Sequence, residues 1–144
     1  MEMSERIAIE RECQRLVTVY CHHVDHGEAE KIADLFTDDG QWLSPEIKMI
    51  GKEQIMKGFA LRQANTARMS RHVCNNFLID VIDENNAEGT VYLTLYRHDG
   101  EAGRKVSPMD DQPVLIGEYR DRFVRTDDGW RFSKREIDVS FIRL

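Results

Sequence analysis

Apolar residues recur every three or four positions over residues 4–25. They form a single stripe that consists of Cys13, Leu16, Val17, Tyr20, Cys21 and Val24. This spacing predicts an amphipathic helix, because positions three and four apart lie on the same side of a helix. We expect Ser4 to cap the start of this helix and Gly27 to end it.

Shorter elements are expected over the next forty residues. The segment Glu28 to Phe36 predicts a second helix, and Asp38-Asp39-Gly40 predicts a turn. Residues 41–43 then predict a short strand that ends before Pro45. A third helix is expected after Gly51, with a buried side made of Ile55, Met56 and Phe59.

From Met69 onward the pattern changes to alternation, which predicts strands at 69–81, 91–96, 115–125 and 130–141. In the first of these strands, one face would carry Val73, Phe77, Ile79 and Val81, and the other His72, Cys74, Asn76 and Leu78. A loop is expected over 99–112. Helices followed by long strands predict an α+β fold, in which three N-terminal helices pack against a strongly curved, mainly antiparallel sheet. A hollow between the first helix and such a sheet would suit a small molecule.

Composition and charge narrow the function classes. The chain has 144 residues, which we interpret as one domain over 1–144. Its net charge of −6 argues against a nucleic acid or an anionic membrane as partner. Three cysteines without framework spacing predict reduced thiols. The charged N-terminus predicts no secretory signal, so we expect a cytoplasmic protein.

Metal and nucleotide cofactors are not expected. His22 and His26 stand one helical turn apart, but zinc usually needs three or four converging ligands. The segment from Gly100 to Gly103 lacks the strand and helix that flank a phosphate-binding loop.

Several short motifs stand in an order that is typical of one superfamily. They are Tyr20-x4-Asp25, Leu35-Phe36-Thr37-Asp38-Asp39-Gly40-x-Trp42, Gly51-Lys-Glu-x-Ile55, Arg71-His72-x3-Asn76, and Tyr119-x-Asp121-x-Phe123 followed by Gly129-Trp130-x-Phe132-x2-Arg135. The chain thereby resembles the SnoaL-like branch of the nuclear transport factor 2-like superfamily. That branch includes scytalone dehydratase, bile-acid dehydratases and hexachlorocyclohexane dehydrochlorinase. The resemblance implies a cone-shaped α+β barrel with a deep pocket open at one end.

The resemblance also implies roles for individual residues. His72 would act as a general base on a C–H bond, and Asp25 would orient it. Tyr20 and Arg135 would stabilise developing charge. Apart from the resemblance, we expect Trp42, Phe59, Asn76 and Tyr96 to line the substrate pocket. A histidine that takes up a proton repeatedly needs a partner to fix its tautomer, and a carboxylate meets that need.

Each of these side chains also has a purely structural interpretation. His72 and Asp25 can form a buried polar pair that holds the helix to the sheet. Tyr20 can be a core aromatic residue with a satisfied hydroxyl. Arg135 shares its alternation with Ile137, so it can pair with Asp25 or Asp121, or it can bind an oxygen-rich ligand.

The favoured hypothesis is a cofactor-independent lyase or isomerase, dehydratase-like in mechanism, that acts on a small, largely apolar ring compound. The alternatives are a non-catalytic small-ligand-binding protein and an accessory subunit of the same fold. An open sheet face is often buried by self-association, so we expect a homodimer or a homotrimer.

Overall fold

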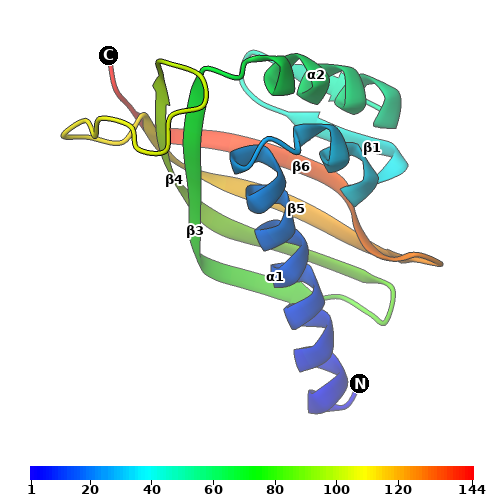
Figure 1. Cartoon of the computed structure of the whole chain (residues 1–144). Helices are drawn as coiled ribbons and strands as arrows, with labels where there is room; N and C mark the ends of the chain where they lie inside the picture. The colour runs from blue at the N-terminus through cyan, green and yellow to red at the C-terminus, as the bar shows by residue number, and fades with distance from the viewer.

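Helices occupy the first half of the chain and long strands the second half. A computed structural model describes all residues, 1–144. The elements are α1 (Met3–Asp25), the 3-10 helix η1 (Ala29–Leu35), β1 (Phe36–Leu43), β2 (Lys48–Ile50), α2 (Lys52–Ala64), β3 (Arg68–Val81), β4 (Asn86–Asp99), β5 (Leu115–Thr126) and β6 (Gly129–Ile142). The expected fold class is confirmed: helices cover one side of a curved sheet in an α+β arrangement (Figure 1).

The six strands form one sheet in the order β2-β1-β6-β5-β4-β3. All neighbouring pairs are antiparallel except β1 and β6, which run parallel. The sheet is mixed and does not close on itself, and α1 crosses its concave side with its C-terminal end toward the start of β3 (Figure 1). This crossing brings the last turn of α1 to the strand that carries His72.

The apolar stripe of α1 fills the space between helix and sheet, as its spacing predicts. All six residues of that stripe are buried, together with Ile9. They pack against inward residues of the sheet that include Val91, Leu93, Phe123 and Phe132. Gly27 follows the helix with a φ of 75°, a left-handed conformation that suits glycine. No helix in the structure is both long and apolar enough to cross a lipid bilayer.

Several local expectations were wrong. The helix begins at Met3, and the backbone N–H of Glu2 donates to the carboxylate of Glu5 at 3.2 Å, so Ser4 lies inside the first turn and does not cap it. Strand β1 already begins at Phe36 and includes the expected turn, and β2 was not foreseen. In α2, Ile55 and Phe59 are buried as expected, but Met56 is 49% exposed.

A bulge in β3 inverts the alternation that the sequence predicts. The β3–β4 pairing shifts register between Asn75 and Leu78, and Asn76 adopts a φ of 55°. Because the bulge adds one residue, His72 and Cys74 share the inward face with Phe77 instead of opposing it. Val73 lies on the outer face instead, where it is 45% exposed.

Strand β6 shows the same effect at two places. The β5–β6 register shifts opposite Ser133 and again opposite Ser140. Arg135 is therefore inward like Phe132, whereas Phe141 is 68% exposed on the outer face. The expectation of one inward alternation from Arg131 to Phe141 is correct only around Arg135 and Ile137.

Candidate functional site

The strongest candidate site joins the C-terminal end of α1 to the start of β3. Asp25 is the last residue of α1, and its side chain is only 5% exposed. His72 lies on the inward face of β3 with its side chain 12% exposed. The Nδ1 atom of His72 lies 2.7 Å from Oδ1 of Asp25, so the structure brings together the two residues that the motifs single out.

Three donors converge on the Asp25 carboxylate. The ring Nδ1 of His72 and the hydroxyl of Ser70 both contact Oδ1, at 2.7 and 2.8 Å. The backbone N–H of His72 donates to Oδ2 at 2.8 Å. Burial by itself raises the pKa of the Asp25 carboxyl, but the contacts with His72 and Ser70 outweigh burial and leave that pKa below its ordinary value. Asp25 is therefore ionised at neutral pH.

This arrangement determines the tautomer of His72. A carboxylate only accepts hydrogen bonds, so the ring hydrogen must lie on Nδ1. In the neutral ring, Nε2 then carries a free lone pair. Nε2 has no hydrogen-bond partner and is not fully buried.

Two residues that support this pair were missed by the sequence analysis. Ser70 is 2% exposed and donates to Asp25, while Nη2 of Arg62 in α2 donates to the Ser70 hydroxyl at 3.0 Å. A chain of contacts therefore runs from Arg62 through Ser70 to Asp25 and His72. A serine two residues before a histidine on a strand is the only sequence signal for it, and this signal is weak.

Tyr20, Trp42 and Phe59 form an aromatic cluster beside α1. The indole N–H of Trp42 donates to the Tyr20 hydroxyl at 3.0 Å. Phe59 meets the rings of Tyr20 and Trp42 edge-on, with centroids 6.0 and 5.9 Å apart. Burial raises the pKa of Tyr20 to about 12, although Arg135 and Trp42 oppose the rise. Tyr20 therefore remains a neutral phenol that can donate its own hydrogen.

Arg135 lies at the centre of the molecule and pairs with Asp121. Its Nε and Nη2 atoms lie 2.9 and 3.2 Å from the two oxygens of Asp121, in a bidentate pair with both side chains almost fully buried. The guanidinium lies 3.5 Å from the ring centroid of Tyr119 and 4.3 Å from that of Tyr20. Burial opposes the positive charge, but Asp121 outweighs it and raises the pKa of Arg135. Of the open alternatives, the structure shows the pairing with Asp121.

One donor of Arg135 remains free. Nη1 is the single fully buried side-chain nitrogen or oxygen without a hydrogen-bond partner. Buried donors are seldom left unpaired, so the two N–H groups of Nη1 are an exception in the core near Tyr20.

Two expected pocket residues lie elsewhere, which corrects their placement. Asn76 is the exposed residue of the β3 bulge. Tyr96 pairs with Arg71 across β3 and β4, on the face opposite to buried Leu95, so it lies on the outer side of the sheet. The bulge at Asn76 explains the first outcome, because it reverses the faces of β3, whereas the regular alternation of β4 already places Tyr96 opposite Leu95.

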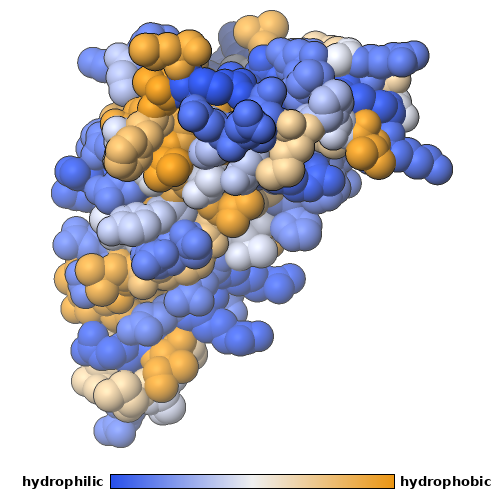
Figure 2. Space-filling view, turned by 90° about the vertical axis from the view of Figure 1, so that its left-hand side faces the viewer, coloured by the Kyte–Doolittle hydropathy of each residue, from blue (hydrophilic) through white to orange (hydrophobic).

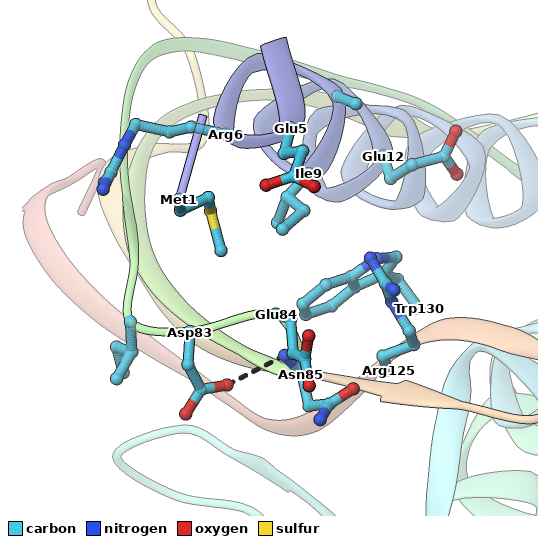
Figure 3. Close-up of a pocket in the computed structure, with 12 residues that line it drawn as sticks. Met1, Glu5, Arg6, Ile9, Glu12, Asp83, Glu84, Asn85, Arg125 and Trp130 are labelled. Atoms are coloured by element: carbon cyan, nitrogen blue, oxygen red, sulfur yellow. Dashed lines mark hydrogen bonds between the residues drawn. The ribbon is translucent and has the colours of Figure 1, made fainter. Parts of the chain in front are cut away.

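The main cavities of the structure do not lie at His72. One of about 970 Å³ lies at the other end of α1, between Glu5, Ile9 and Trp130 and the turn that contains Asp83 (Figure 3). A second of about 330 Å³ lies on the outer side of β4 and β5. A third of about 320 Å³ lies beneath the 107–114 segment and touches Ser70. Neither His72 nor Asp25 lines any of these three cavities.

No group of three or more histidine, cysteine or acidic side chains is arranged to hold a metal ion. The rings of His22 and His26 stack 5.3 Å apart at the end of α1, and both residues are exposed. Nδ1 of His26 contacts the backbone oxygen of His22 at 3.0 Å, which is a helix-end contact.

Comparisons with known proteins agree on the fold. The family model of the SnoaL-like domain matches residues 5–136. A candidate scytalone dehydratase from Novosphingobium aromaticivorans is 22% identical with a TM-score of 0.84, and the match covers 99% of this chain and 91% of that one. The structure of LinA is 20% identical with a TM-score of 0.78, over 100% of this chain and 95% of LinA.

A third similar structure is a nuclear transport factor 2-like protein with a cystatin-like fold, also from Novosphingobium aromaticivorans. It is 21% identical with a TM-score of 0.75, over 93% of this chain and 84% of that one. At these identities, the similar structures establish the shared fold and leave the reaction to be argued from the site. The comparison with curated protein sequences finds no match.

Proposed function

The chain belongs to the SnoaL-like domain family, and we propose that it is a cofactor-independent lyase or isomerase that uses His72 as a general base. The observation that carries this proposal is the His72 ring itself. Asp25 holds Nδ1 at 2.7 Å, which leaves Nε2 as an unpaired acceptor on a side chain that is 12% exposed. An inert polar pair in the core has no need for an open nitrogen on the far side of the ring.

In the proposed mechanism, Nε2 removes a proton from a carbon of the substrate. The electron pair of the broken C–H bond forms a double bond, either as a neighbouring group leaves or as charge moves onto a conjugated oxygen. Asp25 stabilises the imidazolium that results, and His72 then returns the proton to the leaving group or to another carbon. Ser70 keeps Asp25 in place throughout.

Tyr20 and Arg135 are proposed to stabilise negative charge on the substrate. Tyr20 is neutral and can donate its hydroxyl hydrogen to a developing oxyanion. Arg135 lies over the Tyr20 ring and keeps Nη1 without a partner, so it acts mainly through Tyr20 and through the positive field of its guanidinium. Trp42 and Phe59 give this region the apolar walls that suit a ring compound.

The experiment that tests this proposal is a proton-abstraction assay with 5-nitrobenzisoxazole, a small apolar ring that opens when a base removes its C–H proton. His72→Gln should lower the rate by ~10²–10⁴-fold, because glutamine keeps polarity but cannot take up a proton. His22→Gln, which changes an exposed histidine outside the site, should leave the rate unchanged. Equal rates in all three proteins would contradict the role of His72.

A second candidate function is binding of a small ligand without catalysis. The observation that favours it is the packed interior, since His72 lines none of the three main cavities. Under this alternative, His72→Gln weakens ligand binding in calorimetry, and no variant shows proton exchange between an acidic C–H ligand and D₂O by NMR. Exchange that depends on His72 would favour the enzyme.

Self-association through the outer face of the sheet is also proposed, as a homodimer or a homotrimer. Val73, Tyr92 and Phe141 are 45%, 50% and 68% exposed on β3, β4 and β6. Figure 2 shows apolar side chains in clusters on the side of the molecule where β3 lies, among mainly polar neighbours. Light scattering should give a mass of two or three chains, and Tyr92→Lys should shift it toward one chain. A monomeric wild type would contradict this.

The remaining expectations concern the location of the protein in the cell and its need for a cofactor. We propose that the protein works in the cytoplasm without a metal or nucleotide cofactor. Fractionation of cells that express the protein tests the location. Elemental analysis of tag-free protein tests the metal, and one zinc per chain would overturn that expectation.

A further inference from the structure

Two of the three cysteines meet between α1 and β3. The sulfur atoms of Cys21 and Cys74 lie 3.5 Å apart, so no other atom fits between them. Cys21 is 7% exposed, and Cys74 is only partly buried. The third cysteine, Cys13, lies two turns earlier on the same helix, is fully buried and has no sulfur neighbour.

This thiol pair lies directly next to the proposed catalytic pair. Cys21 precedes Asp25 by one helical turn, and Cys74 follows His72 by two residues on the same inward face. Two neighbouring side-chain contacts therefore join α1 to β3 here, Asp25 with His72 and Cys21 with Cys74. Any change in the second pair acts on the same helix and the same strand that position the first.

The two thiols differ in reactivity in a way that suits oxidation. The contact with Cys21 lowers the pKa of the Cys74 thiol. Burial and the charges of Asp121 and Asp25 oppose this, and the positive charge of Arg135 adds to the lowering. The thiolate is the nucleophile in sulfur chemistry. Cys74, the more accessible of the two, is thus the sulfur that attacks first, and Cys21 is in contact to resolve the product.

We propose that Cys21 and Cys74 are a redox-active dithiol that a hydroperoxide converts into a disulfide between α1 and β3, directly beside His72 and Asp25. The Cys74 thiolate attacks one oxygen of the hydroperoxide, the O–O bond breaks, and the leaving alkoxide or hydroxide takes a proton. Cys74 then carries a sulfenic acid. The sulfur of Cys21 attacks that sulfur, the S–S bond forms, and hydroxide leaves with the Cys21 proton as water.

In total, two thiols and one hydroperoxide give one disulfide, one alcohol and one water. With hydrogen peroxide, the products are one disulfide and two waters. Two electrons pass from the two sulfurs to the peroxide. The sulfurs must approach from 3.5 Å to the ~2.05 Å of a disulfide. The 53-residue separation of the two cysteines makes this a long loop closure, which constrains the unfolded chain.

The test counts thiols in the wild-type protein after treatment with hydrogen peroxide. A maleimide added in denaturant should find one remaining thiol of the three, and peptide mapping should place it at Cys13 and find Cys21 joined to Cys74. Dithiothreitol should restore all three. The oxidised protein should melt about 5–10 °C higher than the reduced protein. Oxidation that spares the pair, strikes Cys13 first, or lowers the melting temperature would overturn the proposal.

Three variants separate the roles of the sulfurs. Cys13→Ser should still lose both of its thiols, as the matched control. Cys21→Ser should form no disulfide and should leave a sulfenic acid at Cys74 that dimedone traps. Cys74→Ser should react slowly or not at all. Peptide mapping of the oxidised wild-type protein tests the proposed disulfide even if a variant fails to fold. None of these measurements depends on the proposed enzymatic function.

Discussion

Two acid–base pairs lie inside this protein, and they differ in what they can do. Asp25 with His72 joins a helix to a strand, and Asp121 with Arg135 joins two neighbouring strands at directly opposite positions. The contact distances are similar, at 2.7 and 2.9 Å. One base is a histidine, whose neutral ring can accept a proton, whereas the other is an arginine that stays charged.

Burial separates the two pairs further. Both side chains of the Asp121–Arg135 pair are almost fully buried, whereas His72 keeps a 12% exposed side chain and an open Nε2. A buried permanent ion pair cannot take part in proton transfer, and its loss leaves an uncompensated charge. An acid–base pair that is fully buried, such as Asp121 with Arg135, stabilises the fold. A pair in which one nitrogen stays unpaired, such as Asp25 with His72, can take part in proton transfer.

The largest expected effect comes from breaking the fully buried pair of Asp121 and Arg135, which we call the sealed pair. Asp121→Asn keeps the shape of the side chain but leaves Arg135 as a buried charge without a counterion. We expect the free energy of unfolding to fall by about 3–5 kcal/mol, measured by urea denaturation. Asp99→Asn is the control, because it removes the charge of an exposed pair with Arg68 and should cost less than about 1 kcal/mol. Equal losses in both variants would contradict the comparison.

Arg135→Leu sharpens the same point. If Arg135 mainly awaited a ligand, as one interpretation of the sequence has it, this variant would fold normally and bind ligand less well. The contact with Asp121 predicts instead that Asp121 is left buried and unpaired, with a loss of stability of similar size. Changing both residues together, as Asp121→Leu with Arg135→Met, should recover much of it.

The pair of Asp25 and His72, which we call the open pair, was easier to predict from the sequence than the sealed pair. The motifs identify Asp25 and His72, and the end of one helix meets the start of one strand in this fold. The partner of Arg135 remained ambiguous because both Asp25 and Asp121 were available, and only the strand register decides between them. The fold class followed from the periodicity, which reports local burial directly.

What the sequence could not predict depends on single backbone irregularities. The bulge at Asn76 needs one residue in a left-handed conformation, and nothing in the alternation of β3 marks that position. It reverses which side chains face inward, so the sequence analysis wrongly placed Phe77 on the face of Val73 and Asn76 on the face of His72. Ser70 was missed because a serine on a strand acquires a role only from its three-dimensional neighbours, Arg62 and Asp25.

The next prediction breaks the open pair. In Asp25→Asn, the amide NH₂ must face a donor wherever it lies, since three donors converge on the two carboxylate oxygens. If the amide donates to Nδ1, the ring hydrogen moves to Nε2 and the base is lost. We expect a rate loss of at least ~10²-fold and a stability loss of about 1–3 kcal/mol. Ring ¹⁵N shifts of His72 should report the changed tautomer, and an unchanged tautomer would contradict the pairing.

The same variant should change how stability depends on pH. The pKa of Asp25 is lower in the folded protein than the value of 3.8 expected in the unfolded chain. Its stabilising contribution is therefore complete above about pH 4 and is lost as pH falls through the lower, folded pKa. Urea denaturation at pH 7 and pH 3 should show a smaller loss with acid in Asp25→Asn than in wild type. Parallel curves would show that Asp25 contributes nothing to acid sensitivity.

The smallest expected effect concerns Ser70, which donates a hydrogen bond to Asp25 of the open pair. Ser70→Ala removes one of three hydrogen bonds to Asp25 and takes away the acceptor of Arg62. The backbone N–H and the ring of His72 still hold the carboxylate, so we expect a stability loss of only about 0.5–1.5 kcal/mol.

As a positioning residue, Ser70 should affect the titration of Asp25 more than ligand affinity. Losing one donor to the Asp25 carboxylate raises the pKa of that group toward its ordinary value, which a carboxyl ¹³C titration by NMR should show in Ser70→Ala. Ser70→Thr keeps the hydroxyl and should restore the titration of Asp25. Ser133→Ala, which removes a long contact of 3.4 Å on the exposed side of β6, is the control and should change neither stability nor the Asp25 titration. If Ser70→Ala lowers stability while the Asp25 titration stays fixed, Ser70 supports only the fold, and the open pair is held by His72 and Asp25 alone.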